Sequence, residues 1–206
     1  MTASATVYVV DDDEDAVRPI VKVIEQIGLR AVACGSAREF LDHYRPTGPA
    51  CLVLDVWMPE MSGVALQEQL AAAHLQLPVI VISPYADVRL AVEVMRHGAL
   101  NFLEKPFRMQ ELVESIQEAI RRDQEQWRRR EEQEAATRRF RQLSAPERQV
   151  LELLLAAKTN STIAKELGVS VRTVENRRAR IMKKLGVDSR AELLELARLD
   201  LVSTAS

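Results

Sequence analysis

Short apolar runs alternate with longer amphipathic stretches through the first 120 residues. The runs TVYVV, CLVLD and VIVIS are rich in β-branched residues and end at polar residues, which is typical of buried strands. Including two weaker runs, we predict strands at 6–10, 30–34, 51–55, 79–83 and 101–103. The apolar spacing between them predicts helices at about 14–28, 36–45, 62–74, 86–97 and from 108 onward. This alternation indicates an α/β fold, a doubly wound five-stranded parallel (βα)5 domain.

A different pattern begins after this domain. Residues 121–142 contain no glycine or proline, and opposite charges recur three and four positions apart. This favours a solvated helix that continues the preceding one. A short dimeric coiled coil is the alternative, because Val113, Ile120 and Trp127 lie seven positions apart. Glu134 interrupts that seam, so we favour a helical linker.

The last part of the chain predicts four short helices around a small core. Ser144 and Glu147 have the spacing of a capping box, which marks the start of the first helix. The strings STIAKELG and VRTVENRRARIMKKL predict two helices joined by a tight turn, the layout of a helix–turn–helix. We therefore expect three parts: a (βα)5 domain over 1–122, a helical linker over 123–142 and a small all-α helix–turn–helix domain over 143–206.

Charge is segregated along the chain, although the net charge is only −2. Residues 1–120 carry 9 Lys or Arg and 17 Asp or Glu, a net of −8. Residues 121–142 (8 against 5) and 143–206 (11 against 8) each have a net charge of +3, which indicates that nucleic acid would bind at this end. No run of 18 apolar residues predicts a membrane span, and the two cysteines lack the spacing of a zinc or disulfide framework. We expect a cytoplasmic protein with no membrane partner.

Charged residues follow the ends of the predicted strands. Asp55 ends the third strand and Lys105 follows the fifth. Three acids come directly after the first strand: Asp11, Asp12 and Asp13. Because the carboxyl ends of parallel strands meet at one edge of a sheet, we expect these side chains to share one crevice. Several carboxylates beside one ammonium suit a hard divalent cation and a phosphoryl group.

Four strings in this half, VVDDDE, LVLDVWMPEMSG, VIS and FLEKPF, resemble the receiver domain of bacterial two-component response regulators, over residues 5–120. The resemblance implies that Asp11, Asp12 and Asp55 hold Mg²⁺. It also implies that Asp55 is the phosphoacceptor and that a cognate sensor histidine kinase is the donor.

The same resemblance assigns three residues to the response that follows phosphorylation. Lys105 would pair with the phosphoryl oxygens. Ser83 would supply the hydroxyl that orders the neighbouring loop, and Phe102 would be the rotating aromatic switch.

Three positions near this site depart from the family or crowd it. Relatives usually have, after the hydroxyl residue, a small residue whose backbone N–H binds a phosphoryl oxygen, but Pro84 has no N–H. Trp57 and Tyr85 are bulky and flank the place from which water would attack. Tolerated drift is the alternative interpretation of all three.

The strings LSAPERQVL, TNSTIAKELGVS, RTVENRRARIMKKLGV and SRAELL resemble the LuxR-type helix–turn–helix of NarL/FixJ response regulators. Its recognition helix would begin near Val171 or Arg172, with Val174, Ile181 and Leu185 facing the core by helical spacing. The rest of this helix is basic, as expected of a surface that binds double-stranded DNA. The residues expected to contact the operator are Arg172, Thr173, Glu175, Asn176, Arg177, Ala179, Arg180 and Lys184.

Departures from the family also occur in this half. Where many relatives have TVKxH, this chain has TVENR. Glu175 would accept a hydrogen bond from cytosine N4, and Asn176 is suited to pair with adenine. Ala157 replaces a common glycine.

These features predict a response regulator and not an enzyme. Phosphorylation would promote a homodimer through the fourth helix, fifth strand and fifth helix, and the dimer would bind its operator and act on transcription with RNA polymerase. One alternative, suggested by Pro84, is a phosphorylation-independent DNA-binding regulator with a degenerate receiver. The other is a phosphohydrolase, but such enzymes generally have an acid at the position of Trp57.

Overall fold

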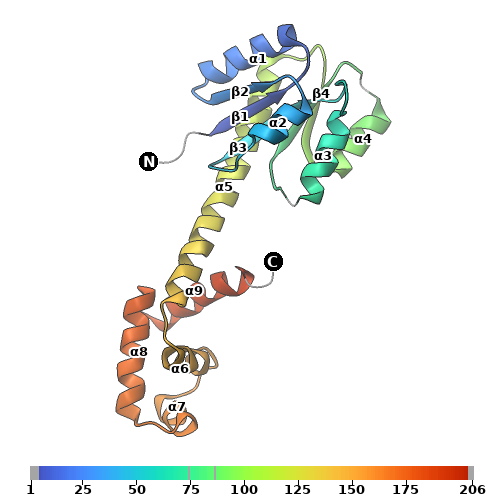
Figure 1. Ribbon diagram of the computed structural model, residues 1–206. Helices are drawn as coiled ribbons and strands as arrows, with labels where there is room; N and C mark the ends of the chain where they lie inside the picture. The colour runs from blue at the N-terminus through green and yellow to red at the C-terminus, as the bar shows by residue number, and fades with distance from the viewer. Residues whose placement is uncertain (1–4, 74, 86, 204–206) are drawn as a thin grey trace. The chain divides into compact units, whose positions relative to one another are not determined.

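The computed structural model describes residues 5–73, 75–85 and 87–203. It divides into two compact units, Met1–Trp127 and Arg128–Ser206 (Figure 1). Two helix ends expected from the sequence, at 74 and 86, lie outside the described residues. Among the helices that the structure describes, none has the length and apolar character needed to cross a membrane.

The first unit is built on a parallel sheet in the strand order β2-β1-β3-β4-β5, which confirms the expected doubly wound fold. The strands are β1 (Thr6–Val10), β2 (Arg30–Cys34), β3 (Ala50–Asp55), β4 (Val79–Ser83) and β5 (Ala99–Glu104). β3 begins one residue earlier than expected, and β5 extends beyond the expected 101–103 at both ends. Val10 on β1 pairs in register with Leu54 on β3, so Asp11 and Asp55 leave the sheet side by side.

Helices cover both faces of the sheet. They are α1 (Glu14–Gln26), α2 (Ala37–His43), α3 (Gly63–Ala72), α4 (Val88–Arg96) and α5 (Met109–Arg141). Residues of α2, α3 and α4 pack in one buried cluster with one set of strand side chains, including Phe40, Leu66 and Val94. Residues of α1 and α5, including Ile20 and Leu112, pack with the opposite set. Alternate strand residues therefore serve two separate cores, as expected for strands covered on both faces.

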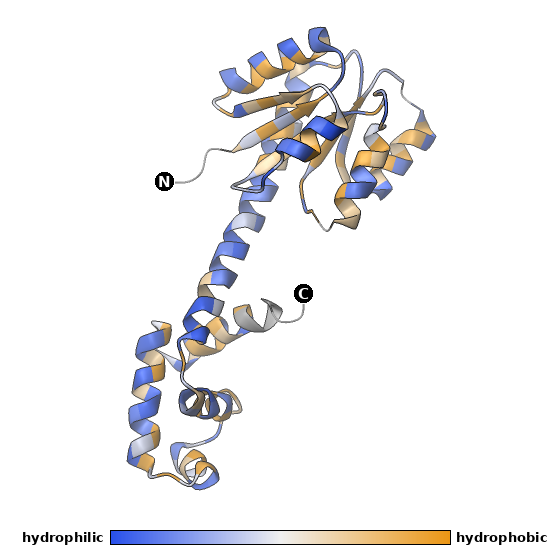
Figure 2. Ribbon diagram, in the orientation of Figure 1, coloured by the Kyte–Doolittle hydropathy of each residue, from blue (hydrophilic) through white to orange (hydrophobic). Residues whose placement is uncertain are grey.

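The expected fifth helix and the expected linker form one continuous helix, α5. Its second half is strongly hydrophilic (Figure 2), and exposed arginines pair with glutamates three and four positions away, as in Arg121–Glu118 and Arg138–Glu134. Ile120 is buried in the second core of the first unit, so it is not free for the coiled-coil seam considered above. The boundaries of the linker at 123 and 142 stay a prediction.

The second unit consists of helices around one small core. They are α6 (Ala145–Leu155), α7 (Asn160–Leu167), α8 (Val171–Leu185) and α9 (Arg190–Ser203). Ser144 and Glu147 form the expected capping box at the start of α6. Gly168 ends α7 in the left-handed conformation and Ser170 caps α8, which makes the tight turn of a helix–turn–helix.

Candidate functional site

Three carboxylates meet at the carboxyl edge of the sheet. Asp11 and Asp12 follow β1, and Asp55 ends β3. One oxygen from each lies within 4.8 Å of the others. Asp11 and Asp55 are buried, while Asp12 is exposed, so the group opens to solvent on one side. The structure thus brings together the acids that strand order alone predicts to be neighbours.

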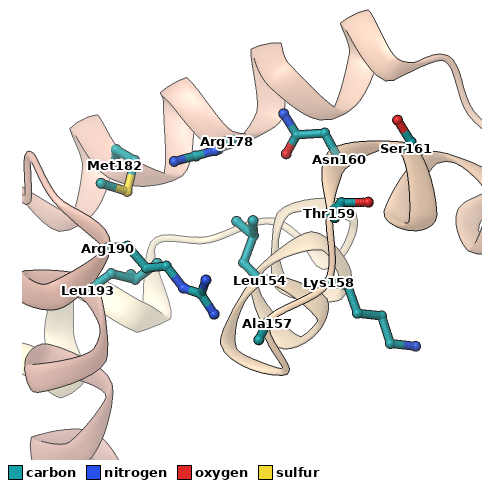
Figure 3. A pocket seen from close by; sticks show the side chains of 10 residues that line it. All are labelled: Leu154, Ala157, Lys158, Thr159, Asn160, Ser161, Arg178, Met182, Arg190 and Leu193. Atoms are coloured by element: carbon teal, nitrogen blue, oxygen red, sulfur yellow. The ribbon is translucent and has the colours of Figure 1, made fainter.

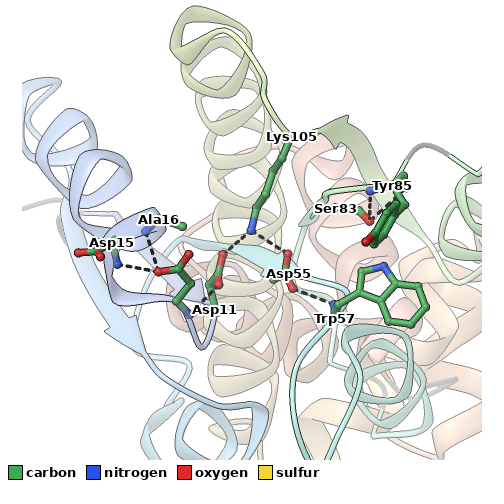
Figure 4. Close-up of polar contacts among 9 residues, drawn as sticks. Asp11, Asp15, Ala16, Asp55, Trp57, Ser83, Tyr85 and Lys105 are labelled. Atoms are coloured by element: carbon green, nitrogen blue, oxygen red, sulfur yellow. Dashed lines mark hydrogen bonds and ion pairs between the residues drawn. The ribbon is translucent and has the colours of Figure 1, made fainter.

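Lys105, after β5, bridges two of these acids (Figure 4). Its Nζ lies 2.7 Å from Asp11 Oδ2 and 2.9 Å from Asp55 Oδ1. Burial raises the pKa of Asp55, and the hydrogen bond from Lys105 opposes that rise only in part. Burial alone would lower the pKa of Lys105, but its hydrogen bonds to Asp11 and Asp55 outweigh burial and raise it. Lys105 therefore stays an ammonium at neutral pH, in contact with two of the three carboxyl groups.

Local backbone contacts hold the acids in place. The third acid of the run, Asp13, is the N-cap of α1: its Oδ1 accepts hydrogen bonds from the backbone N–H groups of Asp15 and Ala16. On the other side, the N–H of Trp57 donates to Asp55 Oδ2 at 2.8 Å. A Cβ on Gly63 would lie 2.2 Å from the Asp55 carbonyl oxygen, so only glycine allows α3 to approach the end of β3 this closely.

The residues expected to respond to phosphorylation lie beside this cluster. The buried Ser83 hydroxyl donates to the Tyr85 carbonyl at 3.2 Å and accepts from the Tyr85 N–H at 3.3 Å. Phe102 is half-buried and packs against the core formed with α2, α3 and α4. Trp57 and Tyr85 make an edge-to-face pair with ring centroids 6.2 Å apart. Both residues are mostly exposed, at 58% and 67%.

On α8, the buried and exposed faces are opposite each other. Val174, Ile181 and Leu185 are buried, as the sequence predicts. A step of two positions along an α-helix turns about 200°. The face opposite the core therefore carries the exposed residues two positions from the buried ones: Arg172, Asn176, Ala179 and Lys183.

The predicted DNA contacts divide into groups. Arg172, Asn176 and Ala179 lie on the opposite face, and Glu175 and Arg180 are exposed beside it. The remaining three are less free: Arg177 is half-buried, Thr173 Oγ1 lies 2.8 Å from Ser170 Oγ at the helix cap, and Lys184 contacts Glu147.

Lys184 is engaged within the second unit. Its Nζ lies 2.7 Å from Oε2 of the buried Glu147, and it also donates to the Gln142 carbonyl at 3.3 Å. The hydrogen bond from Lys184 and that from the Ser144 N–H lower the pKa of Glu147 to about 2. Lys183, by contrast, is exposed on the face opposite the core, although it is not among the residues expected from the sequence to contact the operator. Its spacing from Ile181 and Leu185, two positions from each, is the sequence signal that places it on this face.

Comparison with known proteins matches both units to described families. Residues 7–117 match the response regulator receiver domain, and residues 141–197 match the luxR family of bacterial regulatory proteins. The chain is 40% identical to the transcriptional regulatory protein FixJ of Azorhizobium caulinodans, over 100% of this chain and 97% of that protein. It is 37% identical to the nodulation protein W of Bradyrhizobium diazoefficiens, over 95% of this chain and 86% of that protein.

Solved structures agree with these families. The response regulator StyR is 38% identical, with a TM-score of 0.88, over 95% of this chain and 99% of that one. Full-length FixJ from B. japonicum is 34% identical, with a TM-score of 0.57, over 98% of this chain and 99% of that one.

A receiver domain followed by a LuxR-type domain defines a two-component response regulator. The chain belongs to this family, to its NarL/FixJ type, and it controls transcription. Its receiver implies a sensor kinase as one partner, and its LuxR-type domain implies DNA as another. Receiver domains generally bind Mg²⁺ at an acidic pocket, the kind of cluster that Asp11, Asp12 and Asp55 form here.

Proposed function

We propose that phosphorylation of Asp55 by a cognate sensor histidine kinase switches this regulator. The observation that carries the proposal is the ammonium of Lys105, which contacts Asp11 and Asp55 at once beside a third carboxylate. Attack of an Asp55 oxygen on phosphorus would form an acyl phosphate and release the kinase histidine. Lys105 is already within hydrogen-bond reach of Asp55, so it is placed to pair with an oxygen of the new phosphoryl group.

The three carboxylates fit a Mg²⁺ ion. Their oxygens lie close enough to share one cation, and the exposed side at Asp12 leaves room for the waters that Mg²⁺ usually keeps. When bound, the ion supplies charge neutralisation and orients the phosphoryl donor. Asp11, Asp12 and Asp55 would hold it, and Lys105 would then be released from Asp11 to face the phosphoryl oxygens.

The loop after β4 carries the response. The Ser83 hydroxyl would exchange its bonds with the Tyr85 backbone for a phosphoryl oxygen, and Phe102 would turn into the space that Ser83 leaves. Pro84 provides no N–H, so the phosphorylated state has one donor fewer than in relatives with a small residue there. The Trp57–Tyr85 pair obstructs the approach of water, so hydrolysis of the acyl phosphate is slowed.

Dimerisation would use the face that includes α4. Val88, Val92 and Met95 are exposed apolar residues at positions i, i+4 and i+7 of this helix, and they form one apolar stripe. An exposed apolar stripe of this kind is suited to pair with a second copy of itself. The phosphorylated state would favour the dimer only as far as it stabilises this face in its pairing conformation.

In the DNA complex, the face of α8 opposite the core would enter the major groove. We place Arg172, Asn176, Ala179 and Lys183 against the bases and Arg180 against a phosphate. Two chains would bind adjacent half-sites, and contact with RNA polymerase would convert occupancy into a change in transcription. Because it would bind DNA and RNA polymerase, the protein would act in the cytoplasm.

A second candidate function rests on Pro84. If the missing N–H prevents switching, the chain is a DNA-binding regulator that acts without phosphorylation. The ion pairs of Lys105 with Asp11 and Asp55 favour the first proposal, because a receiver without phosphotransfer has no need to keep this group together.

Labelling with acetyl phosphate and Mg²⁺ tests the site assignment. Intact mass should show one phosphoryl group per chain in the wild type and none in Asp55→Asn. Asp13→Asn is the matched control, because asparagine also caps a helix and Asp13 lies outside the carboxylate group. Stoichiometric labelling of Asp55→Asn would overturn the proposal.

A further inference from the structure

A pocket of about 380 Å³ lies between the helices of the second unit and opens to the surface, where Arg178 and Arg190 are exposed (Figure 3). It is lined by the end of α6, the start of α7, the middle of α8 and the start of α9. Its volume falls in the range of small-molecule sites, about 300–1,000 Å³. None of the functions assigned above uses it.

The charge in this cavity is positive and unbalanced. Arg178 from α8 and Arg190 from α9 both line it, and among the residues that the structure describes no Asp or Glu does. Within the described part of the chain, neither guanidinium has a hydrogen-bond or ion-pair partner, whereas neighbouring lysines do. Lys158 pairs with Glu166 at 2.7 Å, and Lys184 pairs with Glu147. Arg190 extends toward the turn between α6 and α7, beside Leu154 in Figure 3. Two guanidinium groups at one cavity are a preferred arrangement for an oxyanion.

The rest of the lining is mixed. Leu154, Met182 and Leu193 give it an apolar wall. On the opposite side, α7 begins at Asn160, so the positive end of the helix faces the same space. A ligand that fits both the apolar wall and the positively charged side of the pocket has an anionic head and a small apolar body.

The position of Arg178 separates this cavity from the DNA-binding face. Arg178 lies four positions after Val174 and three before Ile181, which places it beside the buried stripe of α8. The proposed base contacts at Asn176 and Lys183 lie on the other side of the helix. A molecule held by Arg178 therefore does not share the major groove with them.

We infer that the cavity binds a small organic anion, a carboxylate or a phosphate monoester on an apolar body. Such a ligand would contact α8 together with α6, α7 and α9, and would stabilise their packing by mass action. The DNA-binding unit would then respond to a metabolite directly, in addition to the signal that arrives through the receiver.

The test uses the full chain with its methionine methyl groups labelled with ¹³C. Benzoate and phenyl phosphate are the probes, and benzamide is the neutral counterpart of benzoate. At least one probe should shift the Met182 methyl resonance in a saturable manner, and benzamide should not. Arg178→Gln and Arg190→Gln should each weaken the binding by roughly tenfold or more, because each removes a charge-assisted hydrogen bond.

Arg198→Gln is the matched control, since Arg198 is exposed on the same helix as Arg190 and does not line the cavity. It should bind the probes like the wild type. Absence of a saturable shift with both probes would overturn the inference. It would also be overturned if Arg178→Gln and Arg190→Gln bound the probes with the affinity of the wild type. If Arg178→Gln and Arg190→Gln instead lower the salt dependence of DNA binding and no probe binds, the two arginines contact DNA phosphates and the inference is wrong.

Discussion

The two adjacent lysines near the end of α8 should have opposite roles. Lys184→Met would leave the carboxylate of Glu147 without its cation, although Ser144 would still donate two hydrogen bonds to Oε2, at 2.8 and 2.9 Å. Removal of one partner from a fully buried ion pair costs about 3–5 kcal/mol. Because the Lys184 side chain is 38% exposed and the Ser144 bonds remain, we expect a loss nearer about 1.5–3 kcal/mol, the value of a hydrogen bond to a charged group.

The pH dependence of this stability has a defined sign. Folding lowers the pKa of Glu147 from 4.5 to about 2, so the ionised carboxylate stabilises the fold fully above about pH 4.5. That contribution is lost as the pH falls toward 2. In Lys184→Met the folded pKa of Glu147 should lie closer to its ordinary value, so the stability of the helical unit should fall less steeply with acid.

The assay is urea unfolding of the full chain followed by NMR. Signals from α8 report on the helical unit, and signals from the sheet serve as an internal reference. Lys183→Met is the matched control: it should leave the free energy of unfolding unchanged but weaken DNA binding, because it removes a proposed base contact. Equal stability of the two variants, or a loss of DNA affinity confined to Lys184→Met, would refute the reasoning.

Four further substitutions test other parts of the molecule. Ala157 has a φ of 63°, so Ala157→Gly should raise the free energy of unfolding of the helical unit by about 1 kcal/mol in urea titrations. Gly63→Ala should abolish acetyl phosphate labelling at Asp55 with the DNA-binding unit still folded by NMR, because a Cβ there meets the Asp55 backbone. Pro84→Ala should increase the dimer fraction at equal labelling in sedimentation experiments, since a restored donor is worth about 1.5–3 kcal/mol. Trp57→Asn should shorten the acyl phosphate lifetime without changing dimer affinity.

The sequence predicted best those features that follow from strand order. Alternation of strands and helices is enough to place Asp11, Asp55 and Lys105 at one edge of the sheet, because parallel strands leave no other arrangement of their carboxyl ends. The core positions of α8 also followed directly, since Val174 and Ile181 recur at helical spacing.

The sequence did not predict which partner a side chain contacts when several partners are possible. Lys184 looks like part of a basic DNA-binding face in the sequence, and only the packing of α6 against α8 shows that Glu147 takes it. The contact of Trp57 with Tyr85 likewise depends on the path of two loops from different strands. The cavity at Arg178 joins four helices, and no local pattern identifies it.

The most direct test of the central claim is DNA affinity as a function of phosphorylation. DNA selected from a random library by the phosphorylated chain would be titrated with wild-type protein, with and without acetyl phosphate and Mg²⁺, and with Asp55→Asn. We predict that phosphorylation raises both the affinity for DNA and the dimer fraction of the wild type, and that Asp55→Asn remains at the unphosphorylated level in both. Equal DNA affinity of fully labelled and unlabelled wild-type protein would contradict the account and favour a receiver that no longer controls DNA binding.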